Sequence, residues 1–149
     1  MDDITRLMIE RACERLIAEY ARLVDFGHAA RIADLFTADG VWESGDLRME
    51  GREAIRTGFG RREGIARRVS RHVCTNVIID VLSDDRARGQ TYLVNFRYDR
   101  RDGDLPGFPV PAGSPKFVGE YHDWYVCTPE GWRFSRRVCS LAFVRPPSR

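Results

Sequence analysis

Three residues of this 149-residue chain have side chains that together could move a proton. Tyr20 and Asp25 lie near the end of the first helical segment, and His72 opens a strand-like run. A carboxylate that contacts an imidazole fixes its tautomer and makes the ring a stronger base. A phenol adds a hydrogen-bond donor. We therefore interpret the chain first as a small acid–base enzyme with Tyr20, Asp25 and His72 as its catalytic residues.

Each of these residues also has an ordinary structural explanation. Asp25 lies at a predicted helix end, where an Asp commonly bonds the local backbone or caps the next helix. His72 alternates with Asn76 and Ile78, so we expect them to share one strand face, where a histidine can simply donate to a buried carbonyl. Tyr20 lies on the apolar stripe of its helix and suits the core. The pair Asp25 and His72 is stronger evidence than either residue alone.

The predicted chemistry begins with a proton removed next to a carbonyl group. The enolate oxygen that forms needs preorganised donors, for which the Tyr20 hydroxyl, Asn76 and Arg136 are candidates. Loss of a neighbouring hydroxyl gives dehydration, reprotonation elsewhere gives isomerisation, and attack on a carbonyl carbon gives cyclisation. The residues that we expect in the substrate pocket are Trp42, Phe59, Asn76, Tyr92, His122 and Arg136.

Two of these pocket candidates have competing interpretations. Arg136 shares a predicted strand face with Phe134, so it is expected to point inward. An unpaired inward guanidinium is costly, so a structural ion pair with Asp39 or Asp123 is the favoured explanation. His122 lies in a strand whose two faces are both half apolar, so the sequence leaves its direction open.

Composition indicates a globular protein of one domain, residues 1–149, with 43% apolar residues. No apolar run approaches the roughly 20 residues that span a membrane. The acidic start of the chain is unlike a secretory signal. We expect a cytoplasmic protein with no membrane partner.

Neither the cysteines, the histidines nor the basic residues form a recognisable binding motif. The four cysteines are far apart and lack a C-x-x-C pair, and the three histidines lack metal-ligand spacing. The 24 basic residues are balanced by 22 acidic ones, and the arginines clustered between residues 61 and 71 are best explained as a solvated face. We therefore expect no metal, no cofactor and no nucleic-acid partner.

The apolar pattern divides the chain into a helical front half and a strand-rich back half. One long helix is predicted from Ile4 to Val24, followed by a short helix that stops near Asp39-Gly40. A small hairpin surrounds Ser44-Gly45-Asp46, and a third helix is predicted from Arg52 to about Arg68. Four long strands are predicted at Val73 to Leu82, Ala87 to Tyr98, Phe117 to Thr128 and Trp132 to Val144.

Helices followed by a strand meander predict an α+β fold. In such a fold a strongly curved, mostly antiparallel sheet wraps over the helices. The curvature leaves an apolar hollow against the long helix, which is a natural place for a small-molecule site.

Six short motifs occur in order along nearly the whole chain. They are Tyr20-x4-Asp25, Asp34-Leu35-Phe36-Thr37-Ala38-Asp39-Gly40-Val41-Trp42, Gly51-Arg52-Glu53-Ala54-Ile55, Arg71-His72-x3-Asn76, Gly119-x-Tyr121-x-Asp123 and Gly131-Trp132-Arg133-Phe134. As an ordered set, they resemble the SnoaL-like branch of the nuclear transport factor 2-like superfamily. The resemblance implies a cone-shaped α+β barrel with a deep pocket, assembled as a homodimer or higher oligomer through the outer face of the sheet.

Within that superfamily, the chain is similar in pocket pattern to the scytalone dehydratases and bile acid 7α-dehydratases. In those enzymes a helix tyrosine, an aspartate five residues later and a histidine at the start of the first long strand line the pocket. The resemblance carries these roles to Tyr20, Asp25 and His72. Trp42 occupies the region where a further tyrosine is expected, so the group that polarises the substrate is not assigned.

Two other functions remain open. The fold implied also resembles the noncatalytic β subunits of ring-hydroxylating dioxygenases, which mainly hold an assembly together. A ligand carrier would use the same pocket without turnover. The loop from Arg100 to Lys116 contains four of the seven prolines and could serve as a lid or as an interface element.

Overall fold

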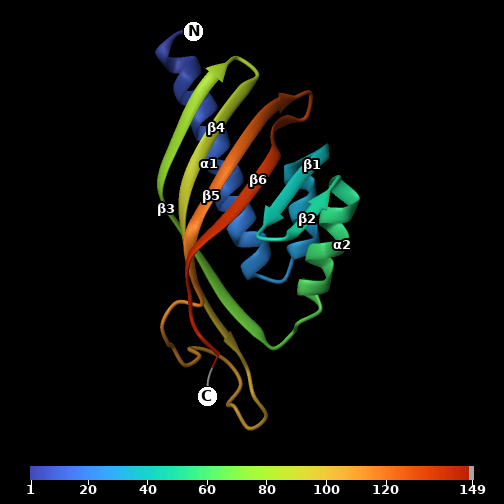
Figure 1. Ribbon diagram of the computed structural model, residues 1–149, viewed down its shortest axis with the longest axis vertical. Helices are drawn as coiled ribbons and strands as arrows, with labels where there is room; N and C mark the ends of the chain where they lie inside the picture. The colour runs from blue at the N-terminus through green and yellow to red at the C-terminus, as the bar shows by residue number, and fades with distance from the viewer. Residues whose placement is uncertain (148–149) are drawn as a thin grey trace.

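The computed structural model describes residues 1–147, in which one six-stranded sheet packs against helices (Figure 1). The helices are α1 (Asp3–Asp25), the 3₁₀ helix η1 (Ala29–Leu35) and α2 (Arg52–Glu63). The strands are β1 (Phe36–Ser44), β2 (Leu47–Glu50), β3 (Arg68–Ser83), β4 (Arg86–Asp99), β5 (Phe117–Thr128) and β6 (Gly131–Val144).

The long helix α1 has clear signals at both ends. The Asp2 carboxylate accepts the backbone N–H of Thr5 at 2.7 Å, which caps the first turn. Its buried face is formed by Ile9, Cys13, Leu16, Ile17, Tyr20, Leu23 and Val24. Just beyond the helix, Gly27 has a φ of 83°, a left-handed conformation that favours glycine and turns the chain. Asp25 is therefore held at the end of a rigid element.

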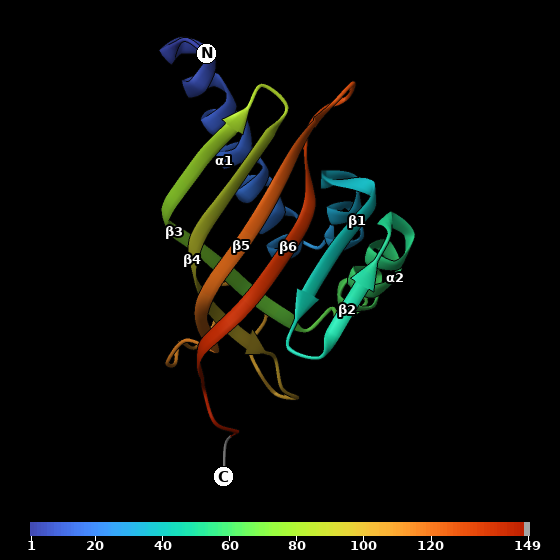
Figure 2. The same ribbon diagram turned by 45° about the horizontal axis from the view of Figure 1, so that its top comes forward.

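The strands follow the order β2-β1-β6-β5-β4-β3. The pair β1 and β6 is parallel, whereas the other four neighbouring pairs are antiparallel. Figures 1 and 2 show the sheet curving around α1, with the short β1–β2 hairpin and α2 at one side. The predicted curved α+β architecture is confirmed. The sheet does not close into a complete barrel, because β2 and β3 remain its two edges.

Most predicted elements are present with shifted ends. The third helix ends at Glu63, earlier than predicted, and β3 already begins at Arg68. The short second helix is a 3₁₀ helix that ends at Leu35, so Asp39-Gly40 lies within β1 instead of ending a helix. This difference matters because the earlier start of β3 brings Ser70 into the strand, beside His72.

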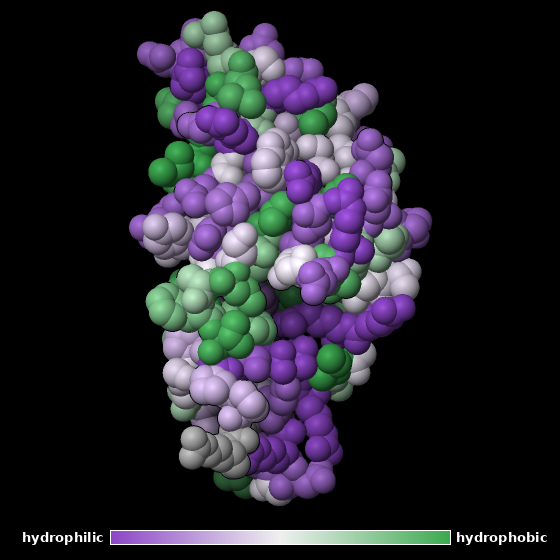
Figure 3. Space-filling view, viewed as in Figure 1, coloured by the Kyte–Doolittle hydropathy of each residue, from purple (hydrophilic) through white to green (hydrophobic). Residues whose placement is uncertain are grey.

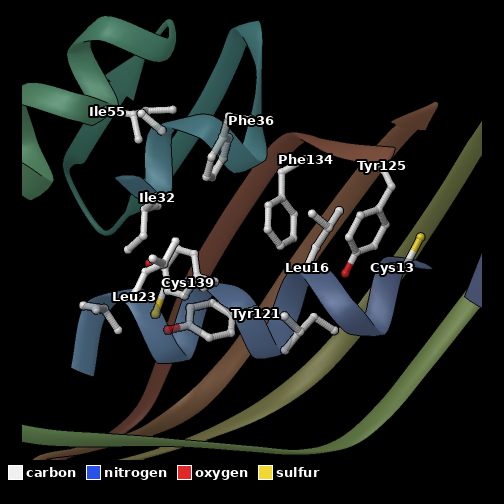
Figure 4. Close-up of a cluster of buried hydrophobic side chains, with 14 of the residues drawn as sticks. Cys13, Leu16, Leu23, Ile32, Phe36, Ile55, Tyr121, Tyr125, Phe134 and Cys139 are labelled. Atoms are coloured by element: carbon white, nitrogen blue, oxygen red, sulfur yellow. The ribbon is translucent and has the colours of Figure 1, made fainter. Parts of the chain in front are cut away.

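The core lies between α1 and the concave face of the sheet. Figure 4 shows Tyr125 and Phe134 projecting from the sheet toward Leu16 of α1. The rings of Phe134 and Tyr125 lie 5.2 Å apart, and so do those of Phe134 and Phe36. These aromatic contacts join α1, the sheet and the start of β1 into one core.

The surface mixes apolar and hydrophilic residues on the face drawn in Figure 3. Large apolar side chains on the convex side of the sheet are exposed, among them Val73, Ile78, Tyr92, Phe96 and Trp124. No helix within residues 1–147 combines the length and the apolar character needed to cross a membrane.

Candidate active site

Asp25 joins the end of α1 to the beginning of β3. Its Oδ1 accepts a hydrogen bond from the Ser70 hydroxyl at 2.8 Å and lies 2.6 Å from Nδ1 of His72. Its Oδ2 accepts the backbone N–H of His72 at 2.7 Å. These partners lie on β3, so Asp25 does not serve the local backbone of the helix end. Three donors hold the carboxylate, which is 5% exposed, in one orientation.

The imidazole of His72 lies between Asp25 and a cavity. Because Asp25 accepts from Nδ1, the neutral ring carries its proton there and has its lone pair on Nε2. Asn95, the cross-strand partner on β4, places its Nδ2 3.4 Å from both ring nitrogens. Nε2 is therefore the atom that can take a proton from a bound molecule.

Tyr20 is buried in the cavity wall one turn before Asp25. Its hydroxyl oxygen accepts the indole N–H of Trp42 at 3.0 Å, and its ring makes an edge-to-face contact with Phe59. Burial raises the pKa of Tyr20 to about 12. The phenol therefore keeps its proton near neutral pH, and the Trp42 bond directs that proton away from the indole. Trp42 and Phe59 thus lie beside Tyr20, in the region predicted for the pocket.

The cavity has a volume of about 860 Å³ and extends between the sheet, the end of α1, the hairpin and α2. This volume is in the usual range for small-molecule sites. Tyr20, Trp42, Phe59 and His72 line it, together with further apolar side chains. The further apolar residues come from β2, β4, β5, β6 and the two α-helices, and they are Val24, Leu47, Met49, Ala54, Leu93, Phe117 and Leu141. The walls therefore suit a molecule with a largely apolar body.

Two positioning residues were not singled out from the sequence. Ser70 bonds Asp25 and also accepts a hydrogen bond from Nη2 of Arg62 at 3.0 Å. Ser70 lies two residues before His72, so strand alternation could have placed both on one face. Asn95 could not be found without the register of β3 and β4. Arg62 was interpreted only as part of a solvated basic face.

A buried ion pair stands behind the cavity wall. Arg137 donates to both carboxylate oxygens of Asp123, at 2.7 and 2.9 Å, and both side chains are fully buried. Burial opposes the charge of Arg137, but Asp123 outweighs it and raises the pKa of the guanidinium. The guanidinium lies 4.3 Å from the Tyr20 ring centre and 3.8 Å from that of Tyr121. It therefore supports two phenols of the cavity wall.

The predicted inward position of Arg136 is wrong. An irregularity in the β5–β6 pairing sets Trp124 opposite Arg136 and Tyr125 opposite Phe134, so Ser135 is an extra residue. One extra residue inverts the alternation. Arg136 consequently lies outside, bonded to Glu43 at 3.0 Å, whereas Arg137 is inside and takes the partner predicted for Arg136, Asp123.

A second irregularity moves Asn76 out of the predicted pocket. The β3–β4 register shifts between Thr75 and Ile78, and Asn76 has a φ of 51°. Asn76 and Ile78 are consequently exposed, while Val77 packs toward the core. Asn76 does not share a face with His72, and it cannot polarise a substrate bound beside His72.

Tyr92 and His122 also lie away from the cavity. Tyr92 is half exposed on the convex side, because its neighbours Thr91 and Leu93 point inward and are buried. His122 alternates with the inward Tyr121 and Asp123, so it too lies on the convex side. Both positions correct the predicted pocket set.

The loop between β4 and β5 does not line the cavity beside His72. Its residues Val110–Ser114 line a separate hollow against the paired ends of β3 and β4. Leu105 and Phe108 are strongly exposed. Within residues 1–147, no three His, Cys, Asp or Glu side chains gather as metal ligands would.

Known structures with this architecture include two that are named as candidate enzymes. A candidate scytalone dehydratase from Novosphingobium aromaticivorans is similar with a TM-score of 0.82 and 23% identity, over 99% of this chain and 93% of that one. LinA is similar with a TM-score of 0.77 and 18% identity, over 99% and 95% of the two chains. A candidate aromatic ring hydroxylase from Novosphingobium aromaticivorans reaches a TM-score of 0.71 at 19% identity, over 92% and 91%.

None of the curated protein sequences matches the chain. The family model of the SnoaL-like domain matches residues 5–138, which include most of α1, the pair Asp25 and His72, and the buried ion pair. The curved, unclosed sheet with its long helix agrees with that match. The chain therefore belongs to the SnoaL-like family.

Proposed function

We propose that this protein is a cofactor-independent acid–base enzyme, a dehydratase, isomerase or cyclase. Its substrate is a small, mainly apolar molecule with a carbonyl group, aromatic or polycyclic in its body. The observation that carries the proposal is the His72 ring in the cavity wall with Nδ1 2.6 Å from Asp25, which leaves Nε2 as the nitrogen that can take a proton. Membership of the SnoaL-like family supports it, since the family includes such enzymes.

The first proposed step is proton transfer from carbon to Nε2 of His72. The C–H bond breaks, its electron pair moves into the carbonyl to form an enolate, and Asp25 stabilises the imidazolium through Nδ1. The Tyr20 hydroxyl donates to the enolate oxygen, because its own oxygen is occupied by the Trp42 N–H. In these assignments His72 is the base, Asp25 is the carboxylate that orients it, and Tyr20 is the hydrogen-bond donor.

The second step depends on the substrate. Where a hydroxyl lies on the carbon next to the carbanion, the imidazolium returns its proton to that oxygen and water leaves. Where there is none, the proton returns to another carbon and the double bond moves. Both outcomes regenerate neutral His72 and need no redox change.

Deuterium exchange tests the first step whatever the second one is. Purified protein in deuterated buffer is incubated with α-tetralone and its β-hydroxy derivative, and mass spectrometry follows deuterium uptake and water loss. We expect His72→Gln to lower the exchange rate by roughly 10²- to 10⁴-fold. The control is Arg67→Gln, since Arg67 is exposed and paired with Asp102 at 2.6 Å. Equal exchange by wild type and His72→Gln with both compounds would contradict the proposal.

A noncatalytic scaffold is the second candidate function. The similarity to a candidate aromatic ring hydroxylase favours it, because the resemblance to dioxygenase β subunits rests on the same fold. A scaffold would copurify with a larger catalytic subunit containing an iron–sulfur centre. A ligand carrier would bind α-tetralone without exchange, and His72→Gln would not alter that binding.

We also propose that the protein is a homodimer formed through the convex face of the sheet. This face carries exposed apolar side chains, Val73, Ile78, Tyr92, Phe96 and Trp124. Both charges occur there as well, for example Arg136 with Glu43, and such a surface can complement itself across a two-fold axis. Light scattering should give twice the monomer mass, and Trp124→Glu should give the monomer. A monomeric wild type at micromolar concentration would contradict the proposal.

A further inference from the structure

The cavity wall carries more positive charge than its neighbours balance. Its charged residues, apart from His72, are Arg48, Glu53, Arg61 and Arg62. Arg48 is paired with Glu43 and Glu50, and Glu53 with Arg56. Among residues 1–147, neither Arg61 nor Arg62 has a carboxylate within ion-pair distance. The guanidinium groups of Arg61 and Arg62 therefore lie at the cavity without a carboxylate in contact among the described residues.

Arg62 is the more confined of the two. Its side chain is half-buried, and burial lowers the pKa of its guanidinium. The one hydrogen bond of this side chain within the described residues goes to the Ser70 hydroxyl. A guanidinium has five N–H donors, and a neutral hydroxyl does not offset its charge. The guanidinium, which contributes to the cavity lining, is thus short of acceptors.

Arg62 is also close to the proposed base. Nη2 bonds Ser70 at 3.0 Å, Ser70 bonds Asp25 at 2.8 Å, and Asp25 lies 2.6 Å from His72. An anion held by the free edge of Arg62 would sit in the same cavity as Nε2 of His72. The alternative is a structural role, in which Arg62 is only a distant counter-charge for Asp25 or a cation that complements the end of α2.

We infer that Arg62 is an anion-binding residue, and that the cavity takes molecules with an apolar body and one carboxylate. A planar guanidinium edge matches a carboxylate with two parallel hydrogen bonds. The apolar walls hold the body, and Arg61 adds positive charge at the same wall. Identifying such a molecule as the substrate rests on the proposed function, whereas the binding itself does not.

Calorimetric binding of two isosteric probes, naphthalene-2-carboxylate and naphthalene-2-carboxamide, tests the inference. Wild type should bind the carboxylate about tenfold or more tightly than the amide, as expected for a charge-assisted pair. Arg62→Gln should remove this preference, and Arg62→Lys should keep part of it. The control Arg67→Gln should behave as wild type, since Arg67 lies outside the cavity lining. Circular dichroism checks that each variant is folded.

The outcomes separate this inference from the proposed function. His72→Gln should lose deuterium exchange on α-tetralone and yet keep the preference for the carboxylate. Equal binding of the two probes by wild type would overturn the inference, and so would an unchanged preference in Arg62→Gln, the result expected if Arg62 only balances Asp25. Absence of carboxylate binding at millimolar concentration would overturn it as well. The binding results do not depend on whether exchange is observed.

Discussion

At the scale of single residues, Asp25 both connects α1 to β3 and orients the His72 ring, and one substitution tests the two roles. Its Oδ1 accepts hydrogen bonds from the Ser70 hydroxyl and from the His72 ring, while its Oδ2 accepts one from the backbone N–H of His72. In Asp25→Asn, one carboxylate oxygen becomes an NH₂ group that faces a donor. We expect the free energy of unfolding to fall by about 1–3 kcal/mol, because a buried donor loses its acceptor.

The same variant should lose part of the deuterium exchange, though less than His72→Gln, because the base itself remains. Urea denaturation and the exchange assay measure the two effects. His72→Gln is the matched comparison, since it removes the base and leaves the carboxylate. An Asp25→Asn protein with full exchange activity would show that His72 needs no orienting carboxylate.

The contact between Asp25 and His72 could be predicted from the sequence, both from the chemistry of the two residues and from the resemblance, because both lie on long, regular elements. Asn76 and Arg136 were misplaced, because strand alternation inverts at an extra residue and such bulges leave little trace in a single sequence. Arg62 was interpreted only as part of a solvated face, because a basic residue near a helix end usually faces solvent.

At the scale of elements, glycine in β5 allows a close approach to β6 beside the cavity. A Cβ at Gly119 would lie 2.1 Å from the Ser140 carbonyl oxygen and 2.9 Å from Cα of Leu141, both backbone atoms. The strand pairing is irregular at this position, which is two residues before Tyr121 of the cavity wall. Gly119→Ala must therefore displace backbone, and we expect it to lower the free energy of unfolding by about 1–3 kcal/mol or more.

Gly60→Ala in α2 is the matched control. The nearest atom to a Cβ there is Cβ of Ala30 at 3.9 Å, an ordinary contact. Alanine is the better helix former, so this variant should be neutral or more stable by up to about 1 kcal/mol. Urea denaturation compares the two. Equal stability of the two alanine variants would mean that β5 and β6 are not as tightly apposed as the structure has them.

At the scale of the whole molecule, one core packs α1 against the sheet and encloses phenols and thiols that must stay neutral. Burial raises the pKa of Tyr20 to about 12, and those of Tyr121 and Tyr125 well above their usual value of 10. Burial likewise raises the pKa of the Cys13 thiol from 9.0 to about 12. In the unfolded chain these groups regain their ordinary values.

The sign of the resulting pH dependence follows from proton counts. Below pH 9 these groups are protonated in both states, so their burial contributes its full stability. Above about pH 9 for the thiol and about pH 10 for the phenols, the unfolded chain releases protons that the native state retains. The native state then binds more protons, so the free energy of unfolding falls with rising pH, by about 1.4 kcal/mol per unit for each such group.

We therefore expect cooperative alkaline unfolding between about pH 10 and pH 12, in which far-ultraviolet circular dichroism and tyrosinate absorbance change together. Tyr20→Phe removes one of the buried phenols and should make the decline shallower. Tyr92→Phe is the matched control when both variants are made in the monomeric Trp124→Glu background, because Tyr92 is half exposed on the free convex face and its removal should leave the slope unchanged. If all five tyrosines ionised while the circular dichroism stayed native, the phenols would have to reach solvent without unfolding. The cavity wall formed by Tyr20 and Tyr121 would then be open, and Tyr20 could not serve as a protonated donor in a dry site.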